Sequence, residues 1–291
     1  MKYNALFVFL LSVCSALFLS CDNNKEGVSY LAVKLQDSEM WSIIDLKTGK
    51  ILYKDEFENA PSIILNDIFY VINEDGDYDY YNIKDVKKPI NKESFCDVTP
   101  FCKEGFALAV KHGEPISIID KNCKEVATLD KNIMTCSYFV NNCAVVQNNS
   151  GKRGYIDTKG NLLIPMKYDY AYNFSDDGIA IVGKKKGEDS VKYSAIDVKG
   201  NILFEFTNKK YQDFSAFHDG YMPALKKNKI VFLDRTGNES FSVGKTEKAY
   251  LPYFVKVYKN KVVFIDGDKY GIANTKGDII LRAKYDHLCG I

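Results

Sequence analysis

Seven Asp and Asn side chains recur along this chain, and a regular set of such side chains could supply acids, bases or metal ligands. A glycine follows most of them within four residues, as in Asp157-Thr158-Lys159-Gly160. An Asp or Asn that caps its own turn, with a Gly where φ is positive, is typical of a β-hairpin with a glycine bulge. We therefore interpret these residues, called the anchors, as turn formers and not as acids or ligands. The anchors stand 37 to 40 residues apart, at Asp45, Asn82, Asp120, Asp157, Asp197, Asp234 and Asn274.

The other candidates for chemistry do not form a catalytic or metal-binding motif. His112, His218 and His287 lack the HExxH spacing or any similar ligand spacing, and the chain has no GxSxG elbow, phosphate-cradling loop or CxxC pair. The acidic run at residues 74–79 begins like a calcium loop, but Val86 stands where the closing Glu belongs. We interpret the run as an acidic hairpin tip, with calcium as the alternative, and expect no catalytic residue, metal or cofactor.

The N-terminus has the pattern of a processing segment. Residues 5–19 are almost entirely apolar, and Phe18-Leu19-Ser20-Cys21 follows. This motif resembles the lipobox of bacterial lipoproteins, with Phe18 in place of the usual leucine. The resemblance implies that residues 1–20 are a lipoprotein signal peptide and that Cys21 is lipidated, with residues 21–27 as a polar tether. An ordinary signal peptide and an uncleaved anchor helix are the alternatives.

Charge and the predicted lipid together define the expected location. Lys and Arg number 39 against 38 Asp and Glu, so no broad field indicates nucleic acid as a partner. A lipid on Cys21 would place a monomeric, folded body on a membrane of the bacterial cell envelope. We expect the outer membrane, at its periplasmic or its surface face.

The anchor spacing indicates one small β unit copied in tandem. The two residues before each anchor are almost all apolar, and adjacent strand residues face opposite sides of a sheet. A strand buried on both faces belongs to a sheet that lies between two others, as in the blades of a β-propeller. The two residues are Ile43 and Ile44, Tyr80 and Tyr81, Ile118 and Ile119, Tyr155 and Ile156, Ala195 and Ile196, Phe232 and Leu233, and Ile272 and Ala273.

The two ends of the array predict a closed ring. The first unit begins at the strand around Ala32, without the preceding strand that Ala171 marks in an internal unit. At the other end, residues 284–289 form one surplus strand of that type. We therefore predict an all-β domain at residues 28–291, built as a closed seven-bladed β-propeller whose C-terminal strand completes the first blade. An open or irregular β array is the alternative.

One unit resembles a known family. In the fourth unit we expect strands at 153–157, at 162–164 ended by Pro165, at 168–174 and at 179–182. The segment RGYIDTKGNLLIPMKYDYAYNFSDDGIAIV, at 153–182, resembles the WG-repeat family of bacterial proteins. Further copies are Tyr270-Gly271-Ile272-Ala273-Asn274 and Trp41-Ser42-Ile43-Ile44-Asp45. The resemblance implies a β-repeat protein, often an envelope lipoprotein, and brings no catalytic residues.

Cysteine usage does not suggest a disulfide framework. Cys96, Cys136 and Cys289 occupy the repeat position of Ala171, and Cys143 aligns with strand residues of other units. Cysteine behaves as a small buried hydrophobe at such positions, and equivalent positions in different blades are too far apart to pair. We expect most cysteines beyond Cys21 to be free. The pairs left open are Cys96 with Cys102 and Cys123 with a neighbour.

Two functions from different classes remain. The first is a non-enzymatic, lipid-anchored binding or scaffold module that presents propeller loops to a protein or glycan partner, with the ligand-binding residues unknown. The second is a glycan-active hydrolase or lyase that uses loop carboxylates at the central channel. The chain has 20 tyrosines, and we expect most of them, such as Tyr80, Tyr155 and Tyr193, to pack within blades. Stacking of tyrosines on a sugar or peptide is the alternative.

Overall fold

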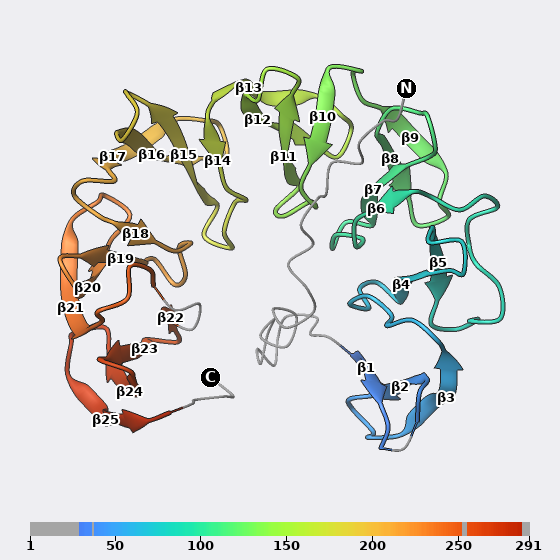
Figure 1. Ribbon diagram of the computed structural model, residues 1–291, viewed down its shortest axis with the longest axis horizontal. Helices are drawn as coiled ribbons and strands as arrows, with labels where there is room; N and C mark the ends of the chain where they lie inside the picture. Colours follow the sequence, from blue (N-terminus) through green and yellow to red (C-terminus); the bar gives the residue numbers. More distant parts are fainter. Residues whose placement is uncertain (1–28, 37, 252–254, 287–291) are drawn as a thin grey trace. The chain divides into compact units, whose positions relative to one another are not determined.

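The computed structural model describes residues 29–36, 38–251 and 255–286, and their regular structure is entirely β-strand (Figure 1). The predicted signal peptide, Cys21 and the tether lie outside the described residues. The chain forms two compact units, the N-unit up to Pro100 and the C-unit from Phe101. Within the described part of the chain, no helix is long and apolar enough to cross a membrane.

The N-unit contains two antiparallel sheets, β1-β2-β3 and β4-β5. Their inner faces pack together through buried side chains that include Ile43, Phe57 and Phe69. The strands are β1 (Tyr30–Lys34), β2 (Trp41–Asp45), β3 (Ile51–Phe57), β4 (Ile68–Ile72), β5 (Tyr78–Asn82) and the short β6 (Asp97–Val98).

The C-unit repeats one antiparallel meander, in which each strand pairs with the next along the chain. A single parallel bridge between Lys245 and Asp266 joins the last two meanders. The strands are β7 (Phe106–Val110), β8 (Ser117–Asp120), β9 (Glu125–Thr128), β10 (Ile133–Cys136), β11 (Cys143–Asn148), β12 (Arg153–Asp157), β13 (Leu162–Tyr168), β14 (Tyr170–Ala171), β15 (Ile179–Lys185), β16 (Val191–Asp197), β17 (Ile202–Thr207), β18 (Asp213–Phe214), β19 (Met222–Lys226), β20 (Lys229–Leu233), β21 (Glu239–Lys245), β22 (Lys256–Tyr258), β23 (Lys261–Asp266), β24 (Lys269–Asn274) and β25 (Ile279–Tyr285).

The anchors form turns, as the sequence predicts. Oδ1 of Asp157 accepts the backbone N–H groups of Lys159 and Asn161, each at 2.8 Å, and Oδ2 accepts the Asn161 amide at 2.9 Å. Gly160 has a φ of 84°, which a residue with a side chain rarely adopts. Asp197 and Asn274 accept the corresponding backbone bonds in their own turns. The anchor side chains therefore serve the hairpins.

In the C-unit, the strand before the anchor is buried on both faces in four repeats, and in the last repeat Ile272 is half-buried. Tyr155 and Ile156 are 0% and 1% exposed, and Ala195 and Ile196 are both 0% exposed. Buried side chains from each sheet contact the next sheet along the chain, and those of β10–β13 pack against those of β14–β17. The predicted stacking of sheets on sheets is confirmed within this unit.

A tyrosine hydroxyl links neighbouring repeats in both units. Tyr155 donates to the backbone carbonyl of Tyr172 at 2.7 Å, and Tyr80 donates to that of Thr99 at 2.7 Å. Both tyrosines are 0% exposed and stand two residues before an anchor. Each buried hydroxyl therefore has a partner in the following repeat, which avoids the cost of an unpaired polar group.

The prediction that Pro165 ends its strand is wrong. β13 runs through Pro165 to Tyr168. The pairing of β12 with β13 has a bulge in β13 opposite Gly154, so that Arg153 lies opposite Tyr168 and Tyr155 opposite Ile164. A bulge on the last strand of a sheet accepts a residue without an N–H donor, which is why the strand continues. A Cβ on Gly154 would lie 2.4 Å from the Ile164 carbonyl oxygen, so this close approach requires glycine.

The cysteines that the structure describes form no disulfide, as expected, and the pairs left open, Cys96 with Cys102 and Cys123 with a neighbour, are not formed. Cys143 lies opposite the anchor Asp157, as Ile179 lies opposite Asp197, so its predicted repeat position is confirmed. Cys123 has a φ of 57° and stands three residues after its anchor, where Gly160 stands in the next repeat. Cys289 lies outside the described residues.

Ring closure stays a prediction. The sheet β1-β2-β3 has three strands, which agrees with the strand expected to be missing from the first unit. Lys284 and Tyr285, expected in the surplus strand, belong instead to β25 and extend its pairing with β24. The rest of that predicted strand, residues 287–289, lies outside the described residues. If the ring closes through it, deleting residues 287–291 should lower the melting temperature of the protein.

Candidate functional site

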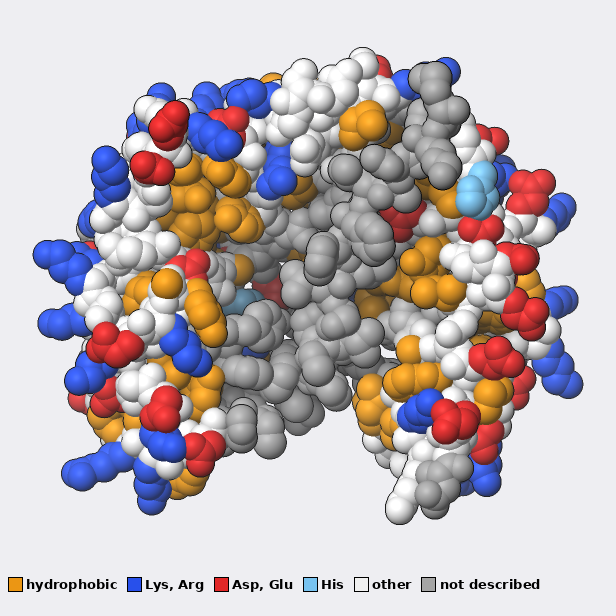
Figure 2. All heavy atoms as spheres, viewed as in Figure 1, with side chains coloured by type: hydrophobic (Ala, Val, Ile, Leu, Met, Phe, Trp, Pro, Cys, Tyr) orange, Lys and Arg blue, Asp and Glu red, His pale blue; other side chains and the backbone are white. Residues whose placement is uncertain are grey.

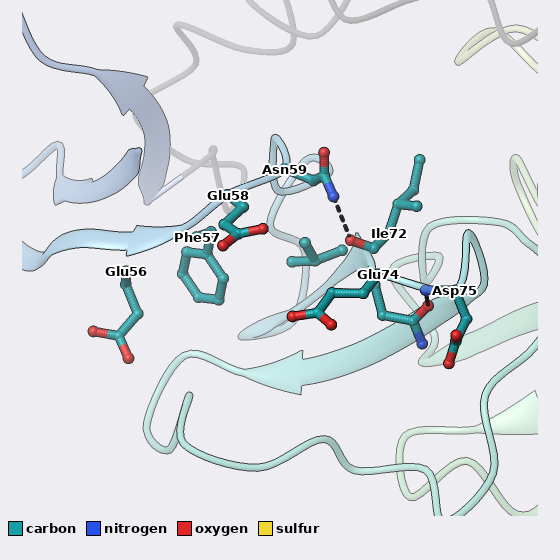
Figure 3. A pocket seen from close by; sticks show the side chains of 9 residues that line it. Glu56, Phe57, Glu58, Asn59, Ile72, Glu74 and Asp75 are labelled. Atoms are coloured by element: carbon teal, nitrogen blue, oxygen red, sulfur yellow. Dashed lines mark hydrogen bonds between the residues drawn. The ribbon is translucent and has the colours of Figure 1, made fainter. Parts of the chain in front are cut away.

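A pocket of about 370 Å³ opens in the N-unit between the end of β3 and the β4-β5 hairpin (Figure 3). We call it the acidic pocket, because four of the residues that line it are carboxylates. The lining residues are Glu56, Phe57, Glu58, Asn59, Val71, Ile72, Asn73, Glu74 and Asp75.

Buried apolar side chains form the floor of the acidic pocket. Phe57 is 7% exposed and Val71 is 7% exposed, and the Phe57 ring meets the Phe69 ring edge to face at 5.5 Å. Glu56, Glu58 and Glu74 are exposed and surround Phe57 in Figure 3. The four pocket carboxylates have no cationic partner among the residues that the structure describes. The pocket thus carries negative charge that the described protein does not neutralise.

The acidic run predicted as a hairpin tip is indeed the turn between β4 and β5. Oδ1 of Asn73 accepts the backbone N–H groups of Asp75 and Asp77 at 3.1 and 3.0 Å. Asp79, at the end of the run, is 8% exposed and accepts hydrogen bonds from Asn91 and Ser94, both at 2.7 Å. Its carboxylate therefore holds the following loop against β5. No cluster of three or more potential metal ligands occurs within residues 29–36, 38–251 and 255–286.

A second pocket, of about 200 Å³, lies in the C-unit between β13 and the sheet that contains β15, β16 and β17. We call it the basic pocket, because four of its lining residues are lysines. The lining residues are Lys167, Tyr168, Val182, Lys184, Lys186, Lys192, Ser194, Ile202 and Glu205.

The charges of the basic pocket are arranged around one tyrosine and one carboxylate. The ammonium groups of Lys167 and Lys184 lie 5.4 and 5.6 Å from the centre of the Tyr168 ring. Lys192 forms an ion pair with Glu205 at 2.6 Å, and Ser194 donates to the same carboxylate at 3.1 Å. The Lys192 hydrogen bond holds the pKa of Glu205 below its usual value, so this carboxylate stays ionised.

The two pockets occupy the same place in the repeat. Phe57 lies opposite Trp41 and Tyr168 opposite Arg153, in both cases four residues before the anchor. Val71 and Val182 lie opposite the residue three places before their anchors. This register makes Glu56 equivalent to Lys167, Asn73 to Lys184, and Asp75 to Lys186. The same structural position is therefore acidic in one unit and basic in the other.

The charge difference extends beyond the pockets. Residues 29–100 contain 8 Lys and Arg and 14 Asp and Glu, a net charge of −6. Residues 101–291 contain 29 Lys and Arg and 22 Asp and Glu, a net charge of +7. Figure 2 shows acidic and basic side chains interspersed over the visible face, with groups of hydrophobic side chains between them. The near neutrality of the whole chain hides two units of opposite charge.

Loop carboxylates of the C-unit have structural partners. Asp177 forms an ion pair with Arg235 at 2.7 Å and accepts the backbone N–H of Gly220 at 3.1 Å. Asp219 accepts the backbone N–H of Lys259, and Asp213 that of Leu251 at 2.7 Å. These carboxylates hold the loop of one repeat to the next.

Two of the three histidines lie within the described residues. His112 is exposed, and His287 lies outside the described residues. Burial lowers the pKa of His218, with a further contribution from Lys256, so the imidazole is neutral at pH 7. His218 lies in the β18-β19 connection, where its backbone pairs with Tyr221. Neither His112 nor His218 lines either pocket.

The tyrosines predicted to pack within blades do so. Tyr80 and Tyr155 are fully buried, and Tyr193 packs against Phe214 and Phe206 at 4.9 and 5.4 Å between ring centres. Tyr172 is 47% exposed and meets the same Phe214 ring at 5.6 Å. Stacking of a ligand on such exposed rings stays a prediction.

The sheets, their shared turn and their face-to-face packing define a propeller-like β-repeat fold. Residues 154–186 match the model of the WG containing repeat family, which confirms the resemblance for this segment. No curated protein sequence matches the chain significantly.

The chain also has similarity to solved structures. The computationally designed Ika8 protein is similar with a TM-score of 0.53 and 15% identity, over 88% of this chain and 86% of that chain. BamB from Moraxella catarrhalis aligns with a TM-score of 0.46 and 11% identity, over 89% and 91%. Hsv2 from Kluyveromyces lactis aligns with a TM-score of 0.43 and 12% identity, over 86% and 87%. The similarity to Ika8 concerns the fold alone.

The sequence interpretation left the binding residues unknown and missed both pockets. Two signals were present in the sequence. Alignment of the repeats on their anchors, with allowance for the bulges, brings Phe57 to Tyr168 and Glu56 to Lys167. The net charges of residues 29–100 and 101–291, counted separately, distinguish an acidic unit from a basic unit.

Proposed function

We propose that this protein is a non-enzymatic, lipid-anchored binding module of the bacterial cell envelope, which holds a protein or glycan partner in the pockets between its sheets. The observation that carries the proposal is the pair of equivalent pockets with opposite net charge, one lined by four carboxylates and the other by four lysines and one carboxylate. Pockets with an apolar floor and a few polar groups are the usual sites of ligand binding. A charge with no partner in the protein favours a ligand of the opposite charge.

The lipid anchor rests on the lipobox-like motif that ends at Cys21. Cys21→Ala removes the acceptor thiol and should move the protein from the membrane fraction to the soluble fraction. Cys14→Ala, in the same apolar segment, is the matched control and should leave the protein in the membrane fraction. Retention of Cys21→Ala in the membrane fraction would show that the anchor is not a lipid on this cysteine.

A glycan and peptide array tests the binding function directly. The full chain, purified in a neutral detergent, should bind a subset of charged ligands. Substitutions in the acidic pocket, such as Glu56→Gln, and in the basic pocket, such as Lys167→Gln, should each weaken a different subset. If neither pocket substitution alters any bound ligand, the pockets are not the binding sites.

The alternative function, a hydrolase or lyase, is supported by the carboxylates of the acidic pocket. Glu56 and Glu58 from the end of β3 and Glu74 and Asp75 from the hairpin line one cavity. A general acid works best where water is excluded, and all four carboxylates are exposed, which favours binding. Release of new reducing ends from a glycan mixture, abolished by Glu56→Gln or Glu58→Gln, would support the enzyme.

A further inference from the structure

We propose that the basic pocket is an anion site that takes a phosphate or sulfate ester group. This inference rests on the proposed binding function and names the ligand chemistry of one pocket. It depends on the charges that meet there, on the walls that enclose them, and on the equivalent pocket in the N-unit.

The basic pocket has more positive charge than its carboxylate can balance. Lys167 and Lys184 have no carboxylate partner among the described residues. Glu205 is already held by Lys192 and Ser194, and the charge of Lys186 also helps to lower the pKa of this carboxyl. Like charges that converge repel one another, and an anion would relieve this repulsion. A cationic or neutral ligand would not.

The walls of the pocket are formed by rigid elements. Tyr168, Val182 and Ser194 are 5%, 1% and 8% exposed, and each lies on a different strand. Lys167 and Lys184 start from the first two of these strands, so the sheets fix the origin of both side chains. A cavity of about 200 Å³ accommodates one charged group with part of its carrier and not a long chain.

The number and origin of the lysines favour phosphate or sulfate over a carboxylate. Lys167 approaches from β13, whereas Lys184 and Lys186 come from β15 and the residue after it. Lysine binds phosphate as a point charge with rotatable donors. A tetrahedral group offers at least three oxygens to donors from different sides, whereas a carboxylate offers two oxygens in one plane. The pocket thus matches the tetrahedral group better.

The equivalent pocket argues that the lysines are not required by the fold. The same repeat position has Glu56, Asn73 and Asp75 in the N-unit, with Phe57 in place of Tyr168. Both pockets form although the charges differ. The scaffold therefore needs the buried ring and valine, and the rim residues are free to serve a ligand.

Calorimetric titration of the full chain in neutral detergent tests the inference. The probes are a sulfated dextran oligosaccharide and inorganic pyrophosphate, with unsulfated dextran and an oligogalacturonate of the same length for comparison. Lys167→Gln with Lys184→Gln should weaken binding of the sulfated probe by about tenfold or more, which is ~1.4 kcal/mol or more, because two charge-assisted contacts are lost. Lys159→Gln with Lys199→Gln removes the same charge from exposed anchor turns and should leave binding unchanged.

The outcomes separate this inference from the proposed function. Binding of the sulfated oligosaccharide or of pyrophosphate supports the anion site if the binding depends on Lys167 and Lys184. Added salt should weaken this binding. An equal loss of affinity in both double variants would show that only the total charge of the protein matters, and would overturn the site. Equal affinity for the oligogalacturonate would overturn the preference for phosphate or sulfate. If neither the sulfated oligosaccharide nor pyrophosphate binds while the array finds a cationic or neutral ligand, the proposed anion site is wrong and the proposed binding function stands.

Discussion

The acidic pocket of the N-unit and the basic pocket of the C-unit share one backbone plan and differ in almost every charged side chain. Phe57 and Tyr168 form corresponding floors, and Val71 and Val182 form corresponding walls. Around them, Glu56 and Asp75 in one pocket correspond to Lys167 and Lys186 in the other. The comparison shows that the repeat fixes where a pocket forms, while individual units decide what charge it presents.

If the two pockets share a scaffold, replacing equivalent core residues by alanine should lower the free energy of unfolding by amounts that differ only because the residues differ in burial. Ile156→Ala removes a side chain that is 1% exposed and should lower the free energy of unfolding by about 2–5 kcal/mol. Ile44→Ala, at the equivalent half-buried position, should cost less. Urea denaturation of both variants makes the comparison. A larger loss for Ile44→Ala would show that the two repeats are not supported in the same way.

β3 beside the acidic pocket and β13 beside the basic pocket pair with their preceding strands through different contacts. A Cβ on Gly154 would meet the backbone of Ile164 and Met166 at 2.4 and 2.7 Å, so Gly154→Ala should cost about 1–3 kcal/mol and displace β13. The equivalent Ser42 already has a Cβ, and its hydroxyl accepts the backbone N–H of Asp55 at 2.9 Å. Ser42→Ala should therefore cost about 1–3 kcal/mol through the lost bond alone. Only Gly154→Ala should also weaken ligand binding at the basic pocket, which a titration with the sulfated probe would measure.

Exchange of the rim charges addresses the comparison most directly. Glu56→Lys with Asp75→Lys gives the acidic pocket lysines at the positions that correspond to Lys167 and Lys186 of the basic pocket. The variant should gain affinity for the sulfated probe by about tenfold, roughly 1.4 kcal/mol. The control is Glu39→Lys with Glu93→Lys, which changes the N-unit charge equally outside the pocket. A gain of the same size in the control would show that overall charge, and not pocket position, sets the ligand.

The smallest expected effect is a pH dependence beside the basic pocket. Hydrogen bonds from Lys152 and Lys192 lower the pKa of Asp169 and Glu205. Because the folded pKa lies below the unfolded value of about 4, the stabilisation is present above pH ~4 and is lost as the pH falls through the folded pKa. Both ion pairs are partly exposed, so we expect a loss below about 1 kcal/mol. Denaturant midpoints at pH 6 and pH 3 measure it, and Asp169→Asn with Glu205→Gln should reduce the difference.

Much of the fold follows from the sequence because turn chemistry is local. An anchor such as Asp157 needs only its own side chain and Gly160 to define a hairpin, so its repetition is visible in the sequence. The burial of Tyr155 and Ile156 follows from the alternation of a strand. The path of β13 through Pro165 did not follow, because it depends on a bulge opposite Gly154 that belongs to the pairing of two strands.

The pockets could not be predicted by the same reasoning. Their residues come from two neighbouring repeats, so Lys167 and Lys184 are brought together only when one sheet packs on the next. The near balance of charges over the whole chain also suggested that no charged surface was present. The opposite charges of residues 29–100 and 101–291 show that the balance arises by cancellation.

The hydrogen bonds of the anchor turns have a consequence for how such a protein can diversify. Each hairpin is specified by one capping side chain and one left-handed backbone position, at the opposite end of the strand from the partners of Phe57 and Tyr168, the buried rings of the two pockets. A freshly duplicated unit would inherit its parent's cavity and could drift toward a new ligand without losing its shape. Glu56 and Lys167, at equivalent positions of two copies, differ in charge as such drift would produce.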